Sequence, residues 1–262
     1  MKTMMQKSKK EGHWFLRALT VLSIGWMVAA TASSAFVAEG ISTEVGPEGP
    51  AQTAYSPYNG KPGPVIIAIS GHTGPTSYQA YAAELAKLGY YVILVDGKDI
   101  LNPEHTGPAN LSKAIDRALN APNAVRGKVA VIGFSQGGGG ALYNAANMTD
   151  AVSMVVAYYP YTRTWANNIN ALVKRFRVPV LVMAGGKDRH NDCCVIESMR
   201  AMEAAAKASG AQFELTVYPE ANHGFNLETG ARGEPISAYR PNDARDAWRR
   251  TVEMLKHYHP LQ

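Results

Sequence analysis

Cysteine is scarce in this chain. Its 262 residues include two cysteines, Cys193 and Cys194, and these are adjacent. Neighbouring Cα atoms lie about 3.8 Å apart, less than the roughly 4.4–6.8 Å that disulfides usually span. The sequence therefore offers no conventional bridge. It favours a buried free thiol beside a second free thiol, and the alternative is a strained vicinal disulfide.

Long hydrophobic runs are also rare, and the clearest lies near the N-terminus. Four lysines and Arg17 precede or enter an apolar run over residues 18–30, and small residues follow at 31–35. A basic start, a short apolar centre and a small-residue end are typical of a secretory signal peptide. We predict a signal peptide over residues 1–35, with cleavage after Ala35 or Ala32. The run is short for a membrane span, although an uncleaved anchor is the alternative because residues 36–38 prolong it.

A strong charge imbalance is missing once this segment is removed. The whole chain carries a net charge of +5, but residues 36–262 hold 21 basic and 20 acidic residues. The excess positive charge therefore lies in the predicted targeting segment, and it does not favour nucleic acid or an anionic surface as a partner. We expect a secreted or periplasmic protein that has no membrane partner after cleavage. We further expect a monomer or a weak homodimer.

Internal repeats and low-complexity segments are absent, and residues 36–262 suit a single α/β domain. After a lead-in over 36–62 with at most short edge strands, short apolar runs alternate with helical patterns. The predicted strands are residues 65–70, 90–95, 129–132, 152–158, 179–184 and 213–218. The predicted helices follow Ser77 and occupy 111–119, 195–208 and 242–258. This order predicts a mainly parallel sheet with helices on both faces and a site at the carboxyl ends of the strands.

The strand at 129–132 runs into Gly-Phe-Ser-Gln-Gly at residues 133–137, and helix formers follow. A serine at such a strand-to-helix turn is held in a strained conformation, and glycines two residues to either side let the strand and helix pass closely. No Lys-Ser/Thr follows the glycines, so the pattern of a phosphate-binding P-loop is missing. We interpret Ser135 as a nucleophile.

A serine nucleophile needs a base and a carboxylate that orients the base. Asp188 follows the strand at 179–184, and His223 follows the strand at 213–218. The order Ser135, Asp188, His223, each beyond a different strand, is that of an α/β-hydrolase triad. Asp192, four residues after Asp188, is the rival carboxylate.

An oxyanion formed during acyl transfer needs backbone N–H donors. We predict that the N–H groups of His72 and Gln136 supply them, with Thr73 as the nearest alternative to His72. The loop containing His72 follows the first predicted strand of the domain, and Gln136 follows the nucleophile.

Residues 63–259 resemble the α/β-hydrolase superfamily and, within it, the dienelactone hydrolase family. The resemblance lies in Ile-Ser-Gly-His at 69–72, Gly-Phe-Ser-Gln-Gly-Gly at 133–138, Gly-Gly-Lys-Asp at 185–188 and the segment 217–225. It implies an α/β-hydrolase fold. There are two departures: Ser135 stands where dienelactone hydrolases carry cysteine, and Ser70-Gly71 replaces the usual His-Gly. The glycine run at 137–140 also resembles secreted polyester and cutinase-like hydrolases.

The resulting hypothesis is a serine esterase that acts through an acyl-enzyme on a small-molecule or polymeric ester. A peptidase, an acyltransferase or a non-catalytic binding protein are the alternatives. Four aromatic residues near strand ends are candidates for the substrate pocket: Tyr159, Tyr161, Trp165 and Phe225. Residues 227–243 are long enough for a lid.

No cofactor is implied, and no metal is predicted. The five residues Asp188, His190, Asp192, Cys193 and Cys194 lie within seven positions but lack the usual ligand spacing of a zinc site.

Overall fold

The computed structural model describes residues 41–44 and 49–261. The predicted signal peptide and its cleavage site lie outside these ranges. Within them, no helix has both the length and the apolar character that a membrane span needs.

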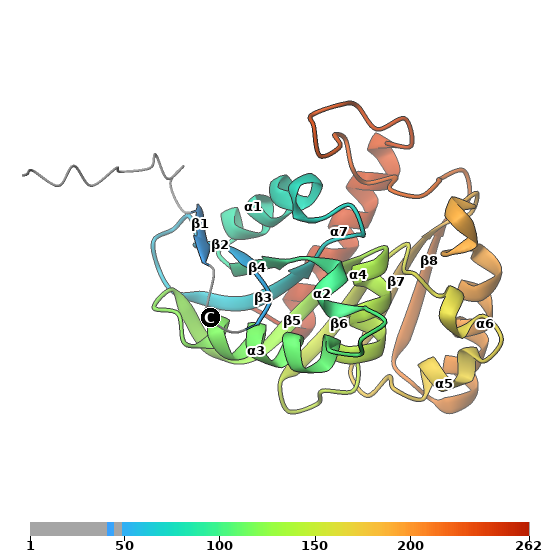
Figure 1. The fold of residues 1–262 in the computed structure, drawn as a ribbon, viewed down its shortest axis with the longest axis horizontal. Coiled ribbons are helices and arrows are strands. Elements are labelled where there is room, and N and C mark those ends of the chain that lie inside the picture. Colours follow the sequence, from blue (N-terminus) through green and yellow to red (C-terminus); the bar gives the residue numbers. More distant parts are fainter. Residues whose placement is uncertain (1–40, 45–48, 262) are drawn as a thin grey trace, which may run out of the picture. The chain divides into compact units, whose positions relative to one another are not determined.

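The core of the fold is an eight-stranded sheet in the order β1-β2-β4-β3-β5-β6-β7-β8 (Figure 1). The strands are β1 Ile41–Glu44, β2 Gln52–Tyr55, β3 Gly63–Ile69, β4 Tyr91–Val95, β5 Ala124–Phe134, β6 Val152–Tyr158, β7 Val180–Gly185 and β8 Phe213–Tyr218. Strands β1 and β2 pair antiparallel, and β2 also pairs antiparallel with β4. All pairings from β4 to β8 are parallel. The predicted mainly parallel sheet and its short lead-in strands are confirmed.

Helices connect the parallel strands, and a last helix follows β8. They are α1 Gln79–Lys87, α2 Gly97–Ile100, α3 Gly107–Leu119, α4 Gln136–Gly140, α5 Ile169–Val173, α6 Ile196–Ser209 and α7 Pro241–Tyr258. A π-helical turn, Ala141–Ala145, continues α4. The short helices α2 and α5 were not predicted, because neither is long enough to show a helical period.

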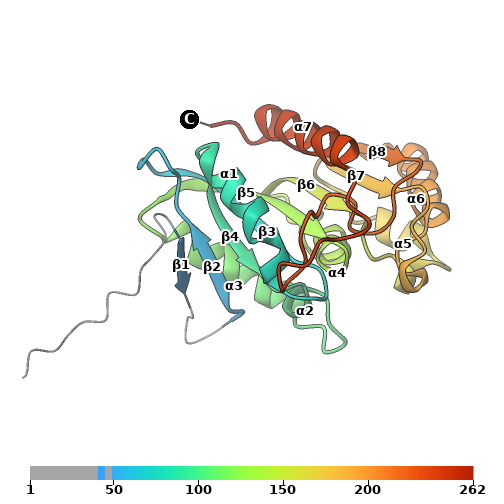
Figure 2. The same cartoon turned by 90° about the horizontal axis from the view of Figure 1, so that it is seen from above.

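Successive side chains of the central strands pack alternately into two separate cores, one on each face of the sheet. Ile67 and Val131 belong to the core that α3 and α6 cover, whereas their neighbours Ile66 and Ile132 belong to the core beneath α1 and α7. Figure 2 shows α1 and α7 on the side of the sheet opposite α3. Because successive strand residues point to opposite faces, continuous apolar strands such as β4 bury every side chain. The sheet is thus fixed from both sides, and its carboxyl edge is left for loops.

One buried histidine ties the C-terminal end of the chain to the sheet. His259 is 6% exposed, stacks on the ring of Tyr90 and places Nδ1 3.2 Å from the hydroxyl of Ser153. The Tyr90 hydroxyl donates to the backbone carbonyl of His259. Burial lowers the pKa of His259 from 6.5 to about 4, because the charged ring loses its hydration.

This burial makes stability depend on pH. Between pH 6.5 and about 4 the unfolded chain binds a proton at His259 that the folded chain does not, so folding stability falls as the solution is acidified. The full loss is about 3 kcal/mol. We expect His259→Phe, which retains a ring beside Tyr90, to weaken this dependence. Urea unfolding at pH 7.5 and pH 4.5 measures it, and an equal loss of stability in both proteins would contradict the assignment.

Candidate active site

The backbone at Ser135 has the strained geometry expected of a nucleophile turn. Ser135 has φ 53° and ψ −115°, a conformation that side-chain-bearing residues rarely adopt. It stands between the end of β5 and the start of α4. A Cβ on Gly133 would lie 2.3 Å from the carbonyl oxygen of Gly137, so strand and helix pass only because Gly133 has no side chain. The predicted role in this close passage is confirmed for Gly133, whereas a Cβ on Gly137 would meet the carbonyl oxygens of Ser70 and Ile69.

The three residues predicted as a triad meet at the carboxyl edge of the sheet. The Nε2 atom of His223 lies 2.9 Å from Oγ of Ser135, and its Nδ1 atom lies 2.7 Å from Oδ2 of Asp188. Asp188 is 1% exposed and follows β7, whereas His223 follows β8. The other carboxylate oxygen of Asp188 accepts the backbone N–H of His190. The hydrogen-bonded chain runs from a buried carboxylate through an imidazole to the serine hydroxyl.

The rival carboxylate lies elsewhere. Asp192 is exposed and has a left-handed backbone with φ 51°. Because the carboxylate of Asp188 already accepts from His223, Asp192 is not the partner of the imidazole.

Aromatic rings enclose the His223 imidazole. The ring of His190 stacks on it with centroids 4.4 Å apart and planes 12° apart, and the buried ring of Tyr159 meets it edge-on at 4.6 Å. The pKa of His190 is lowered, first because the ring is partly removed from water and second because His223 would repel a second positive charge. The neutral form of His190 is therefore favoured beside His223.

The loop after β3 packs against the nucleophile turn. The N–H of Gly137 donates to the carbonyl of Ser70, and the Ser70 hydroxyl accepts the N–H of Gly97. Ser70 thus fixes the loop through its own side chain. His72 and Gln136, the predicted oxyanion residues, both line the cavity onto which Ser135 opens. The side-chain amide of Gln136 donates a hydrogen bond to the carbonyl of Leu101 at 2.6 Å.

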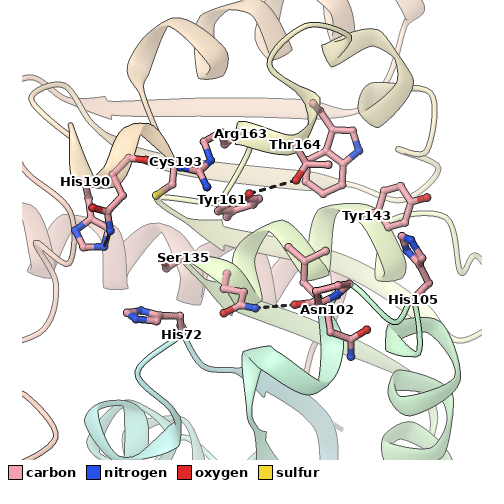
Figure 3. Close-up of a pocket in the computed structure, with 15 residues that line it drawn as sticks. His72, Asn102, His105, Ser135, Tyr143, Tyr161, Arg163, Thr164, His190 and Cys193 are labelled. Carbon is pink, nitrogen blue, oxygen red and sulfur yellow. Dashed lines mark hydrogen bonds between the residues drawn. The ribbon is translucent and has the colours of Figure 1, made fainter.

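This cavity has a volume of about 600 Å³ (Figure 3). In this view Ser135, His72 and His190 lie at the left, whereas Tyr143 and His105 lie at the right. None of the described lining residues is acidic, whereas Arg163 brings a positive charge. Residues 227–243, considered above as a lid, do not contribute to the lining.

Two of the four predicted pocket aromatics line the cavity, and two do not. Tyr161 and Trp165 form part of its wall. Tyr159 and Phe225 are 1% and 0% exposed and belong to the core beneath α1 and α7. The prediction was wrong for Tyr159 because the chain turns directly after β6: Tyr159 has φ 36°, and its hydroxyl donates to Asn226 instead of facing the cavity. It was wrong for Phe225 because this ring packs in the core against Tyr218 and Tyr159.

The expectation of free thiols is also wrong. Cys193 and Cys194 form a disulfide across a Cα–Cα distance of 3.8 Å. The expectation applied the usual spacing of cysteines that are distant in sequence. Adjacent cysteines instead close a small ring that includes their shared peptide bond. Cys193 lines the cavity, so this bridge lies at the site.

Several residues at the site carry no clear sequence signal. Leu101, Asn102 and His105 line the cavity from the segment after β4, and their place at a strand's carboxyl end was the available clue. Tyr143 lies in the π-helical turn beyond α4, where no pattern marks it. Its ring stacks on Trp165 at 5.2 Å and lies 4.2 Å beneath the guanidinium of Arg175.

The strand order, the turn at Ser135 and the three side chains beyond β5, β7 and β8 define an α/β-hydrolase fold. Residues 98–259 match the Dienelactone hydrolase family, and the chain belongs to this family. A Yersinia pestis protein provisionally named a carboxymethylenebutenolidase is 30% identical over 79% of this chain and 83% of its own length. Cutinase 2 of Thermobifida cellulosilytica is 32% identical over 47% of each chain.

Solved structures show the same fold. A Klebsiella pneumoniae protein provisionally named a dienelactone hydrolase superposes with a TM-score of 0.66 at 21% identity, over 80% of this chain and 94% of its own. A dienelactone hydrolase-like promiscuous phosphotriesterase from metagenomic libraries gives 0.65 at 18% identity, over 80% and 92%. The chain is thus related to hydrolases both in sequence and in fold.

The nucleophile turn predicts a measurable stability difference between two glycines. A Cβ on Gly137 would meet the carbonyl oxygens of Ser70 and Ile69 at 2.3 and 2.4 Å, whereas a Cβ on Gly210 would meet nothing within 4 Å. Gly137→Ala should therefore cost about 3 kcal/mol. Gly210→Ala should cost about 1 kcal/mol, because only its left-handed backbone resists the change. Urea unfolding compares the two, and equal losses would contradict the close passage.

Proposed function

We propose that the protein is a serine hydrolase that cleaves carboxylic esters through an acyl-enzyme. The observation that carries this proposal is the hydrogen-bonded chain from Asp188 through His223 to Ser135, which ends at the wall of a cavity. A nucleophile, its base and an orienting carboxylate within hydrogen-bond reach are what acyl transfer requires.

In the proposed mechanism, Nε2 of His223 accepts the proton of the Ser135 hydroxyl as its oxygen attacks the ester carbonyl. Asp188 holds the imidazole in the tautomer that leaves Nε2 free to accept, and it stabilises the imidazolium that forms. The backbone N–H groups of His72 and Gln136 donate to the tetrahedral oxyanion. The imidazolium then protonates the leaving alcohol, and neutral His223 activates water to release the acid.

The cavity narrows the substrate class. Aromatic and aliphatic side chains form part of the lining, which holds no carboxylate within the described residues. Such a surface suits an apolar acyl or alcohol group and disfavours a cationic one. The Yersinia pestis relative, provisionally named a carboxymethylenebutenolidase, supports a small ester as substrate.

A polyester is the second candidate substrate. The local match to cutinase 2 and the aromatic wall around Tyr161 and Trp165 favour it. A polymer segment would need to enter the same cavity, so both candidates use one nucleophile. Hydrolysis of p-nitrophenyl esters of increasing length, beside release of soluble products from an aliphatic polyester film, separates them.

Removing the nucleophile gives the first test. We expect Ser135→Ala to lower kcat for p-nitrophenyl acetate at least about a thousandfold, because no other side chain replaces the attacking oxygen. Ser153→Ala, at a serine outside the cavity, is the matched control and should retain activity. Undiminished hydrolysis by purified Ser135→Ala would overturn the proposed mechanism.

The two nearby carboxylates should behave differently. Asp188→Asn leaves His223 with an amide in place of its charged partner, and kcat should fall by roughly 10⁴. Asp192→Asn changes an exposed residue with a left-handed backbone that asparagine tolerates. It should retain kcat within about twofold. Equal losses in the two variants would contradict the role assigned to Asp188.

The aromatic wall predicts a selective change in specificity. Trp165→Ala removes an indole from the cavity, so kcat/KM for p-nitrophenyl octanoate should fall roughly tenfold while that for the acetate changes little. Tyr58→Ala, at an exposed aromatic residue outside the cavity, is the control. A uniform change across the ester series would place the acyl chain elsewhere.

A further inference from the structure

The Cys193–Cys194 disulfide lies beside the imidazole of the site. Both cysteines are buried, at 6% and 1% exposure. Both sulfur atoms and a ring nitrogen of His223 lie within 4.8 Å of one another. Cys193 is one of the residues drawn around the cavity in Figure 3. The bridge therefore lies next to the proposed catalytic base.

Two loops of the site meet at the peptide groups of Cys193. Its carbonyl accepts the N–H groups of Thr162 at 2.8 Å and Arg163 at 3.1 Å. The hydroxyl of Thr162 adds a third hydrogen bond to the same oxygen at 3.3 Å. The N–H of Cys193 donates to the carbonyl of His190 at 2.9 Å. Cys193 thus joins the loop after β7, which carries Asp188 and His190, to the loop after β6, which forms the aromatic wall.

The two residues before the bridge have an unusual backbone. Asn191 and Asp192 are consecutive left-handed residues with φ 48° and φ 51°. Asparagine and aspartate adopt this conformation more readily than other side-chain-bearing residues, but they do so as single residues, and a consecutive pair persists where its surroundings hold it. His190, directly before them, stacks on His223 and donates its N–H to Asp188. A constraint at residues 193–194 therefore acts on the groups that hold the imidazole.

We propose that the Cys193–Cys194 disulfide is a positioning element for His223. The ring closed by the disulfide restricts the backbone at residues 193–194. This restriction keeps Asn191 and Asp192 in their left-handed conformation and His190 stacked on the imidazole. The same restriction holds the carbonyl of Cys193 against Thr162 and Arg163, and so fixes the cavity wall. The assignment rests on the proposed function in so far as His223 is the catalytic base.

The cluster of two sulfurs and one imidazole is better suited to this role than to metal binding. The sulfurs are bonded to each other. Both nitrogens of His223 are engaged, one with Asp188 and one with Ser135. A metal ion would need thiolates and a free ring nitrogen, and the oxidised cluster offers neither.

Reduction of the bridge tests the proposal. A water-soluble trialkylphosphine breaks the S–S bond: each sulfur gains one electron and one proton, and the phosphine becomes a phosphine oxide that takes its oxygen from water. EDTA in the buffer keeps trace metals from the new thiols. Mass spectrometry of alkylated protein reports the fraction reduced, and kcat, KM and the rate of fluorophosphonate labelling of Ser135 are measured on the same samples.

We expect kcat to fall at least about tenfold on full reduction, because a displaced base loses its alignment with the nucleophile. Labelling of Ser135 should slow in parallel, since it needs the same base. Removal of the phosphine and reoxidation with oxidised glutathione should restore both rates. The double variant Cys193→Ser/Cys194→Ser should have the lowered kcat and should not respond to phosphine. If that variant does not fold, the reduction and reoxidation of the unaltered protein decide the question.

Unchanged kcat and labelling rate in fully reduced protein would overturn the proposal, and so would a lowered thermal midpoint with both rates unchanged, which indicates a purely structural bridge. Ester turnover that is the same with and without the bridge refutes the positioning role of the disulfide and leaves the proposed esterase function standing. Absent turnover with labelling that slows on reduction refutes the ester substrate and supports positioning. Failure to label Ser135 in either form overturns both.

Discussion

The turn at Ser135 depends on a contact between peptide backbones that leaves no room for side chains. Gly133 passes the carbonyl of Gly137, and Gly137 in turn passes the carbonyls of Ser70 and Ile69. One hydrogen bond, from the N–H of Gly137 to Ser70, closes the contact. Because β3 and β5 are neighbours in a sheet buried on both faces, this contact fixes the nucleophile turn and the loop after β3 together. The serine hydroxyl and the residues proposed to bind the oxyanion share one frame.

The imidazole is held by groups from two different loops, the one after β7 and the one after β6. Asp188 fixes one ring nitrogen, the ring of His190 covers one face and the edge of Tyr159 meets the ring from another direction. The Cys193–Cys194 bridge closes the loop that carries the first two. An imidazole supported in this way keeps its orientation while its charge changes, which is what a general base in acyl transfer requires.

Chain order and apolar strands were enough to predict the sheet and the three residues that meet at its edge. Ser135, Asp188 and His223 each follow a strand whose apolar run is visible in the sequence, and parallel strands bring such positions to one edge. The pocket was harder to predict, because Tyr159 and Tyr161 are two residues apart in one aromatic loop and only the backbone turn decides which one faces the cavity. Tyr143 reaches the cavity through packing against Trp165, which leaves no periodic signal.

The most direct test of the proposed nucleophile is to trap the covalent intermediate. The protein is mixed with p-nitrophenyl acetate, quenched in acid during the first turnovers, digested and analysed by mass spectrometry. An acetyl group on Ser135, formed quickly and lost on the timescale of steady-state turnover, is the predicted result. An acetyl group on another residue, or turnover with no acetylated Ser135, would contradict an acyl-enzyme at this serine.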